Sequence, residues 1–154
     1  MNRSASVELR DATAVDAPVL LRMMRRLAEH VPAIPFDEGE VRTALEKFLG
    51  NAELGQAWLL WLDEKPVGYV ILTFGYSFEF RGRDAFVDEL YIELEFRRMG
   101  LGRRAMEFLE KRARELGVNA VHLEVDRAND AAAELYRRAG YADHGRHLMT
   151  KWLR

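Results

Sequence analysis

The stretch 87–102 constrains the fold more than any other part of the sequence. It begins with an apolar run that carries the acidic pair Asp88 and Glu89, and it continues into a basic turn (residues 97–102) that contains Gly100 and Gly102. Apolar residues then repeat at helical spacing: Leu101, Ala105, Phe108, Leu109, Ala113 and Leu116. The sequence therefore predicts a buried strand, a glycine-containing turn and a long helix in direct succession.

This succession suits the binding of phosphate. The first N–H groups of a helix have no partner within the helix, and the helix dipole favours negative charge at that end. Gly100 and Gly102 carry no side chain, so a ligand can approach the backbone closely. Four arginines surround the basic turn: Arg97, Arg98, Arg103 and Arg104. We therefore interpret the basic turn as a polyphosphate-binding site.

A dinucleotide is one ligand that this turn could bind. The segment Gly100-Leu101-Gly102-Arg103-Arg104-Ala105 matches the pattern G-x-G-x-x-G/A, and Glu124 and Asp126 follow about 20 residues later, where an acid would bind ribose. A dinucleotide-binding fold, however, has this turn after its first strand, with several strand–helix units following. Too little chain remains for those units, so a dinucleotide-binding domain is a remote alternative.

Composition excludes several classes of protein. The 154 residues suffice for one domain with a buried core, and we treat 1–154 as a single domain. A net charge of −2 provides no long-range positive field for nucleic acid. The chain has no cysteine, which excludes disulfides and cysteine nucleophiles. The first residues lack the apolar core of a signal peptide, and no apolar run approaches the roughly 20 residues of a membrane span. We therefore expect a soluble, cytoplasmic protein that binds neither nucleic acid nor membrane.

Hydrophobic periodicity gives a coarse order of elements. Strand patterns at 7–10, 56–62, 67–74, 87–93 and 121–125 combine with helical patterns at 17–31, 38–49, 101–116 and 130–139. Residues 75–84 are expected to form a polar loop with aromatic side chains, and 141–152 a final hairpin. The predicted order is β-α-α-β-β-β-α-β-α-β-β. This is an α/β fold with a mixed, mostly antiparallel central sheet and flanking helices.

Four segments in this order resemble the GNAT superfamily of acetyl-CoA-dependent N-acetyltransferases over nearly the whole chain. Arg97-x-x-Gly100-x-Gly102 resembles the family's acetyl-CoA signature, Q/R-x-x-G-x-G/A. Residues 9–17 resemble its first strand and helix, 88–92 its central strand, and 129–141 its last helix and turn. The resemblance implies the GNAT acyl-CoA N-acyltransferase fold, acetyl-CoA as cosubstrate without a metal, and an amine as acceptor.

The resemblance also implies a role for matching residues. The backbone around Tyr91, at Leu90 and Ile92, would pair with the pantetheine arm as an added strand would. The pyrophosphate would be wrapped by the backbone of Arg98, Met99, Gly100, Leu101, Gly102 and Arg103, with the side chains of Arg97 and Arg103 as further candidates. Asn129 would hydrogen-bond the pantetheine. Tyr136 would lie beside the sulfur and protonate the departing thiolate, a suitable task for a phenol because a thiol pKa lies not far below its own.

The acceptor amine must lose a proton before it attacks, and Asp88 and Glu89 are candidates to accept it. Neighbouring residues of a strand point to opposite faces, so only one of the two would face the cleft unless a bulge or splay intervenes. Asp88 shares the parity of Leu90 and Ile92, and it stands where the related polyamine-type acetyltransferases carry a proposed base. We expect Asp88 to be the base, with Glu89 second; a water relay without one essential residue remains open.

The resulting hypothesis is direct acetyl transfer to a primary amine of a small cationic acceptor, polyamine-like or amino-acid-like. Candidate acids for binding such an acceptor are Asp37, Glu38, Glu40, Glu79, Asp88 and Glu89. The alternative is a non-catalytic acyl-CoA-binding regulatory module, which would lack acid–base residues; Tyr136 and Asp88 argue against it. The aromatic residues at 76, 78 and 80 could line the acceptor cleft or a dimer contact, and we expect a homodimer.

Overall fold

A computed structural model describes residues 6–31 and 35–153 of the chain. The chain forms two compact units, Met1–Glu124 and Val125–Arg154. The first unit contains a sheet and the helices that cover it. The second contains one helix and a segment without regular secondary structure.

The helices and strands follow one another in nearly the predicted order. The first unit contains β1 (Val7–Asp11), α1 (Ala17–Ala28), α2 (Glu38–Leu49), β2 (Gly55–Leu62), β3 (Lys65–Ser77), β4 (Gly82–Ile92), α3 (Leu101–Glu115) and β5 (Ala120–His122). Short 3-10 helices at Ala14–Asp16 and Leu94–Phe96 precede α1 and α3. The second unit contains α4 (Asp130–Arg138).

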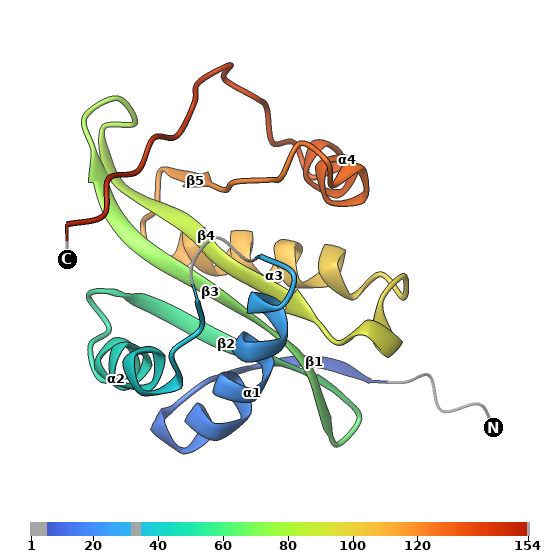
Figure 1. The fold of residues 1–154 in the computed structure, drawn as a ribbon. Coiled ribbons are helices and arrows are strands. Elements are labelled where there is room, and N and C mark those ends of the chain that lie inside the picture. Colours follow the sequence, from blue (N-terminus) through green and yellow to red (C-terminus); the bar gives the residue numbers. More distant parts are fainter. Residues whose placement is uncertain (1–5, 32–34, 154) are drawn as a thin grey trace. The chain divides into compact units, whose positions relative to one another are not determined.

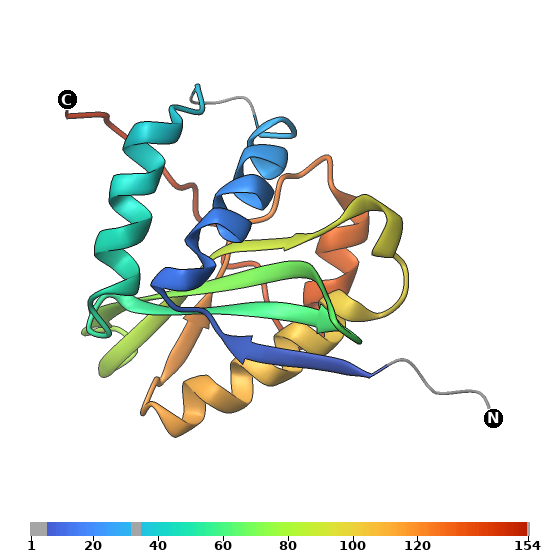
Figure 2. The ribbon, with the colours of Figure 1, turned by 90° about the horizontal axis from the view of Figure 1, so that it is seen from below.

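The strands form one sheet in the order β1-β2-β3-β4-β5. Neighbouring strands are antiparallel except for the parallel pair β4–β5. Figures 1 and 2 show α1 and α2 over one face of this sheet and α3 over the other. The predicted α/β class, with a mostly antiparallel sheet and flanking helices, is confirmed.

Alternating side chains of the strands build an apolar core on each face of the sheet. The face under α1 and α2 buries Leu20, Met23, Leu45, Leu59, Tyr69, Ile71 and Tyr91. On the other face, Trp58 of β2 meets Phe108 of α3 edge to face, with ring centroids 5.6 Å apart. The apolar stripes predicted for α1 and α3 are therefore the faces that these helices bury against the sheet.

Inside the first unit, two predicted boundaries differ from the structure. The loop expected at 75–84 is shorter, because β3 continues to Ser77 and β4 begins at Gly82. The pairing of β3 with β4 extends the hairpin into residues that looked polar enough for a loop. The strand expected at 121–125 is limited to Ala120–His122, since only these residues pair with β4.

In the second unit, the hairpin expected at 141–152 is absent, because residues 141–153 contain neither helix nor strand. Within this segment, residues 143–147 carry no apolar side chain and include Gly145 at a φ of 64°. A left-handed residue and an uninterrupted polar run leave no alternating apolar face for a strand to bury.

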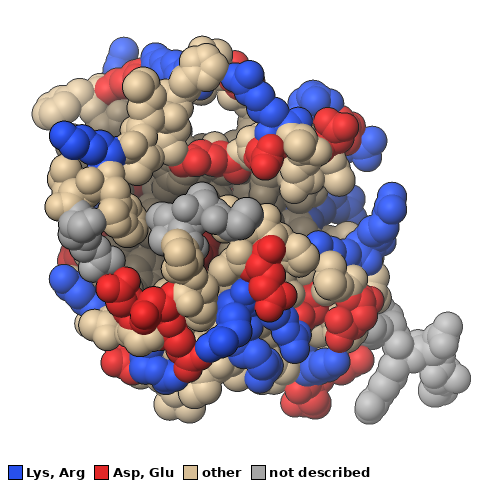
Figure 3. All heavy atoms as spheres, in the orientation of Figure 1, with Lys and Arg blue, Asp and Glu red and all other residues tan. Residues whose placement is uncertain are grey.

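Charged side chains are mixed rather than segregated. Figure 3 shows acidic and basic residues interspersed over the visible face of the molecule. This agrees with a net charge of −2 and offers no broad field of one sign on that face. Within 6–31 and 35–153, no helix combines the length and the apolar character needed to cross a bilayer.

A buried carboxylate fixes the end of β4 to α1. Glu93, directly after β4, is only 5% exposed. It accepts hydrogen bonds from Arg26 Nη1 of α1 at 2.5 Å and from the hydroxyl of Tyr91 at 3.0 Å. A carboxylate is tolerated in such a place only when it is paired. The contact therefore fixes the backbone at the point where the chain leaves the sheet for the basic turn.

The same end of β4 lies very close to β3. A Cβ atom on Gly68 of β3 would be 2.4 Å from the carbonyl oxygen of Tyr91. Because the nearest atom belongs to the backbone of a core strand, the space cannot be provided by a simple side-chain rotation. The absence of a side chain at Gly68 is thus needed for the β3–β4 pairing that positions the end of β4.

We predict that Gly68→Ala lowers the free energy of unfolding by about 1–3 kcal/mol, the usual effect of overpacking. The matched control is Gly39→Ala in the exposed first turn of α2. It should change the free energy of unfolding by no more than about 1 kcal/mol, because alanine favours helix while its Cβ would lie 3.3 Å from Oδ1 of Asp37, which caps α2. Urea denaturation of the two variants measures both changes. Equal stability of Gly68→Ala and the unmodified chain would contradict the close approach of β3 and β4.

Candidate functional site

The second half of β4 has an open edge (residues 87–92). β5 pairs with β4 only at Asp84, Ala85 and Phe86. Beyond Phe86, no strand in the described part of the chain pairs with this edge. Backbone N–H and C=O groups along it are therefore available to a ligand that can pair as a strand does.

The backbone direction at the end of β4 identifies the residues that face this open edge. The N–H of Glu93 donates to the carbonyl of Val67 in β3, so the C=O of the same peptide, that of Ile92, points away from β3. Every second residue of a strand repeats this direction, which places the N–H and C=O of Leu90 and Ile92 on the open edge. The backbone groups of Tyr91, between them, face β3.

The basic turn presents a series of unbonded N–H groups. Between Arg97, whose N–H donates to Leu94, and Arg104, whose N–H donates to Gly100, none of the N–H groups at 98–103 has an acceptor among the described residues. Arg98 and Gly100 are both left-handed, with φ of 62° and 75°. Left-handed residues in a turn direct successive N–H groups into a concavity that suits an anion. The N-terminus of α3 follows and favours negative charge.

The arginines of the turn differ in their partners. Arg97 Nε donates to the carbonyl of Ile92 at 2.9 Å, and its guanidinium lies over the ring of Tyr91 at 5.6 Å. Arg103 pairs with Glu107 at 3.8 Å on the exposed side of α3. Arg98 and Arg104 are exposed and make no ion pair with a described residue. The two unpaired guanidiniums are thus better placed than Arg97 to meet an anion at the turn without first losing a contact.

The place of the basic turn in the order of strands excludes a dinucleotide-binding fold. The turn follows the fourth strand of the chain, and that strand is antiparallel to its neighbour β3. A dinucleotide-binding fold needs a parallel sheet with the glycine turn after its first strand. The remote alternative of a dinucleotide-binding domain is therefore wrong, and the partial match of its fingerprint has no structural support.

A β-bulge at Asp88 changes the geometry of the two acids. Leu72 of β3 pairs with Val87, whereas Ile71 pairs with Glu89, so Asp88 is an extra residue in β4. Alternation from Val87 directs Asp88 toward the face of α1 and α2, and the pairing of Glu89 with Ile71 places Glu89 on that same face. The bulge is the exception under which Asp88 and Glu89 need not point to opposite faces. The expectation that Asp88 shares the face of Leu90 and Ile92 is therefore wrong.

The two acids have different surroundings. Asp88 forms no hydrogen bond with a described residue, and part of its side chain is open to solvent. The protein atoms packed around the rest of it displace hydration water, which raises the pKa of its carboxyl group. Glu89 Oε2 accepts a hydrogen bond from the hydroxyl of Tyr69 at 2.7 Å. Burial raises the pKa of Glu89, the hydrogen bond from Tyr69 opposes this rise, and the negative charge of Asp88 adds to it.

Tyr69 was missed as a site residue by sequence reasoning. It lies in an apolar strand pattern, where an aromatic residue is expected to be core. Only the register of β3 against β4 brings its hydroxyl to Glu89. The local sequence of β3 contains no signal that could have indicated this contact.

In the second unit, Asn129 and Tyr136 belong to α4. Asn129 is the N-cap, and its Oδ1 accepts from the N–H of Ala132 at 3.1 Å, which leaves its Nδ2 to donate elsewhere. Tyr136 lies two helical turns later, so the two side chains share one side of α4. The ring of Tyr136 packs edge to face on Tyr141 at 6.0 Å, and burial raises the pKa of its hydroxyl.

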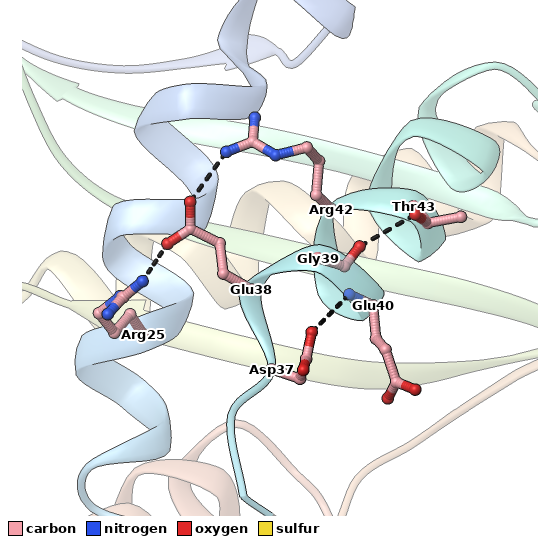
Figure 4. A network of polar contacts seen from close by, with 7 residues as sticks. All are labelled: Arg25, Asp37, Glu38, Gly39, Glu40, Arg42 and Thr43. Atoms are coloured by element: carbon pink, nitrogen blue, oxygen red, sulfur yellow. Dashed lines mark hydrogen bonds and ion pairs between the residues drawn. The ribbon is translucent and has the colours of Figure 1, made fainter.

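Two of the other acids expected to bind an acceptor have structural tasks. Asp37 caps α2 by accepting from the N–H of Glu40 at 2.9 Å. Glu38 lies between Arg25 of α1 and Arg42 of α2, as Figure 4 shows, and these two cations hold its pKa below the ordinary value. Both carboxylates are engaged in holding α1 and α2, so they are poor candidates for acceptor binding.

The three aromatic residues near the β3–β4 hairpin do not form one cluster. Phe80 packs against His122 of β5 with ring centroids 4.8 Å apart. Tyr76 and Phe78 stack edge to face on each other at 5.9 Å, and Phe78 is 92% exposed. An acceptor cleft and a homodimer contact therefore both stay predictions for this pair. In the described residues, no three metal-binding side chains come together.

Comparison with known proteins gives consistent matches. The family model described as Acetyltransferase (GNAT) family matches residues 21–141. A curated relative, thialysine N-epsilon-acetyltransferase from Bos taurus, is 27% identical over 149 residues, covering 90% of this chain and 86% of the relative.

Solved structures match as well. An integron cassette protein from the mobile metagenome of the Cole Harbour salt marsh is 31% identical with a TM-score of 0.84, covering 95% of this chain and 90% of its own. A predicted acetyltransferase from Clostridium acetobutylicum, solved with acetyl-CoA, has a TM-score of 0.80 at 17% identity and covers 95% and 96% of the two chains, which shows the fold alone. With most of its length matched by the family model, the chain belongs to the GNAT family of acetyltransferases.

Proposed function

We propose that the chain transfers the acetyl group of acetyl-CoA directly to a primary amine of a small cationic acceptor, amino-acid-like or polyamine-like. The observation that carries this proposal is the bulge in β4, which brings the carboxylates of Asp88 and Glu89 to one face of that strand. The edge of β4 that does not pair with β3 is open beyond Phe86. GNAT acetyltransferases use acetyl-CoA. Membership of an enzyme family also argues against the alternative of a non-catalytic acyl-CoA-binding module.

The residues of the first unit fit a CoA thioester. Its pyrophosphate would accept hydrogen bonds from the free N–H groups at 98–103, with Arg98 and Arg104 adding positive charge. The amides of its pantetheine arm would pair with Leu90 and Ile92 in the manner of an added strand. Arg97 would then release the carbonyl of Ile92 and become available to a phosphate. Bound acetyl-CoA supplies the thioester whose acetyl group is transferred.

The acid pair fits a positively charged acceptor. Two carboxylates on one face, with few cations near them, attract an ammonium group more strongly than a neutral or anionic molecule. The bovine relative is named for acetylation of the Nε of thialysine, which favours an amino-acid-like amine among the possible acceptors.

Two residues would handle the protons of the reaction. Asp88 is exposed and unbonded, so it can take the proton of the ammonium group directly or through water. The freed amine then attacks the thioester carbonyl, and the C–S bond breaks. Tyr136, whose raised pKa keeps its hydroxyl protonated at neutral pH, would donate its proton to the departing thiolate. Glu89 would bind the acceptor and take second place as a base.

We predict that Gly100→Asp abolishes acetyl-CoA binding, because a negative side chain would enter the group of free N–H donors at the basic turn. Gly102→Asp should act in the same way. Calorimetric titration measures the affinity directly. In a thermal-shift assay, the stabilisation of about 2.7 kcal/mol expected at a hundredfold excess over Kd should be lost.

The matched control for this change is Gly117→Asp. Gly117 follows the other end of α3, is also left-handed with a φ of 70°, and has open space around its Cβ position, as Gly100 does. It therefore reproduces the backbone strain without placing charge at the turn, and should retain binding. Unchanged affinity in a folded Gly100→Asp variant would mean that the cofactor binds elsewhere.

For Tyr136→Phe we predict a fall of roughly 10²–10⁴ in kcat with little change in acetyl-CoA affinity, because ring packing is kept and only the proton is removed. Tyr141→Phe, on the neighbouring ring, is the control and should keep its rate within a few-fold. Steady-state release of CoA measures both. Turnover of the Tyr136→Phe enzyme at the original rate would eliminate Tyr136 as the acid.

The pH dependence separates the two carboxylates. Since the pKa of Asp88 is raised, we expect kcat/KM to fall on acidification at a pH above the ordinary aspartate range, where the base becomes protonated. Asp88→Asn should lose most activity at low pH and recover as rising pH deprotonates the free amine. Glu89→Gln should mainly raise KM for the acceptor. Equal rate losses with flat pH profiles in both variants would assign both acids to substrate binding.

A further inference from the structure

The hydroxyl of Tyr69 lies in the core between the sheet and α1 and α2, yet its hydrogen-bond acceptor is Glu89, one of the two acids at the bulge. The Tyr69 side chain is 0% exposed and lies in the core under α1 and α2. Its hydroxyl lies 2.7 Å from Glu89 Oε2. A buried phenol needs an acceptor, and a core position could have offered a backbone carbonyl. Here the acceptor is a carboxylate directly next to the bulge.

This contact has two physical consequences for Glu89. A hydrogen bond from a neutral donor is stronger to the ionised carboxylate than to the carboxylic acid, so it favours the charged form against burial and against the charge of Asp88. It also holds the carboxylate in one orientation, because Tyr69 is packed on all sides. The other oxygen, Oε1, accepts no hydrogen bond from a described residue. That oxygen remains available to an ammonium group or to water.

Other charged groups near this face are engaged elsewhere. From α1, Arg26 is paired with Glu93, and Arg25 is paired with Glu38. On β4 itself, the hydroxyl of Tyr91 donates to Glu93 rather than to Glu89. The electrostatic influences on Glu89 are therefore its burial, the hydroxyl of Tyr69 and the charge of Asp88. Of these three, Tyr69 alone favours the ionised form.

We propose that Tyr69 is a positioning residue for acceptor recognition: its buried hydroxyl fixes the Glu89 carboxylate at the bulge and presents Oε1 to the ammonium group of the acceptor. This inference rests on the proposed transfer to a cationic amine, and it adds a residue that touches neither substrate. Acetyl-CoA would bind to the free N–H groups of the basic turn, which Tyr69 does not contact. Acetyl-CoA binding is therefore not expected to depend on Tyr69.

The test compares Tyr69→Phe with the unmodified enzyme over a range of pH. Tyr69→Phe keeps the ring and removes one hydroxyl. We expect kcat/KM for a cationic acceptor to fall about 10-fold or more, mainly through KM, because a hydrogen bond to a charged group is lost. The acidic limb of kcat/KM reports Glu89 as well as Asp88, because binding of the cationic acceptor needs ionised Glu89. This limb should move to higher pH, since the ionised form of Glu89 has lost the one hydrogen-bond donor that it has among the described residues. Acetyl-CoA affinity should stay unchanged.

The control for a merely structural effect is Ile71→Val. Ile71 is the direct cross-strand partner of Glu89, and the shorter side chain loosens the same part of the core without touching the Tyr69–Glu89 contact. It should lower stability but leave the acidic limb in place. Tyr69→Phe should also add nothing to Glu89→Gln in the double variant, because the charged carboxylate that the hydroxyl orients has already been replaced by a neutral amide.

The outcomes separate this inference from the proposed function. If the unmodified enzyme releases no CoA with any amine, both fail. If it is active on cationic amines, and Tyr69→Phe keeps the original acidic limb and acceptor KM, the positioning role of Tyr69 is overturned while the proposed function stands. Additive effects of Tyr69→Phe and Glu89→Gln would also overturn it. An NMR titration of the Glu89 carboxyl group, which should shift to higher pH in Tyr69→Phe, gives a readout that does not require activity.

Discussion

The incomplete pairing of β4 is the constraint on which the rest of the structure depends. A strand inside a sheet normally satisfies its backbone on both sides, but β4 keeps a neighbour on its second side only as far as Phe86. Such an edge is a liability unless something covers it. In this chain the short 3-10 helix Leu94–Phe96 connects the open edge to the free N–H groups at 98–103. The backbone groups of Leu90 and Ile92 and the N–H groups at 98–103 thus form a path from the sheet to the N-terminus of α3. They suit a long ligand with amides at one end and phosphates at the other, once Arg97 releases the carbonyl of Ile92.

The remaining features of the first unit hold this path in place. The close approach of Gly68 to Tyr91 fixes the pairing of β3 with β4 on the side away from the open edge. The buried Glu93, held by Arg26, fixes the exit from the sheet. The bulge at Asp88 lies at the other end of the open edge and groups Asp88 with Glu89. Acetyl-CoA would therefore bind through backbone groups, whereas the acceptor amine would bind through side chains. The two binding sites meet on β4.

Parts of this account could be predicted from the sequence because they depend on local patterns. The helix after Gly100 and the strand before it follow from apolar periodicity and from glycine at a turn. The bulge could not be predicted, because an inserted residue has no sequence signature until the register of the partner strand is known. Without the bulge, the alternation rule gave the wrong face for Asp88. The contact of Tyr69 with Glu89 depends on the same register. The pairing of Glu38 with Arg42 follows from i,i+4 spacing within α2. Its pairing with Arg25 needed the packing of α1 on α2, which no local pattern gives.

The most direct test of the central claim is hydrogen exchange of individual backbone amides with and without acetyl-CoA. The account predicts that the N–H groups of Leu90 and Ile92 and those at 98–103 exchange rapidly in the free protein and become protected by the ligand. Amides of α2, which packs against α1 and β2, should not change. Protection of α2 without protection at 98–103, or no ligand-dependent protection along the open edge, would contradict the claim that free backbone groups of β4 and the basic turn bind the cofactor.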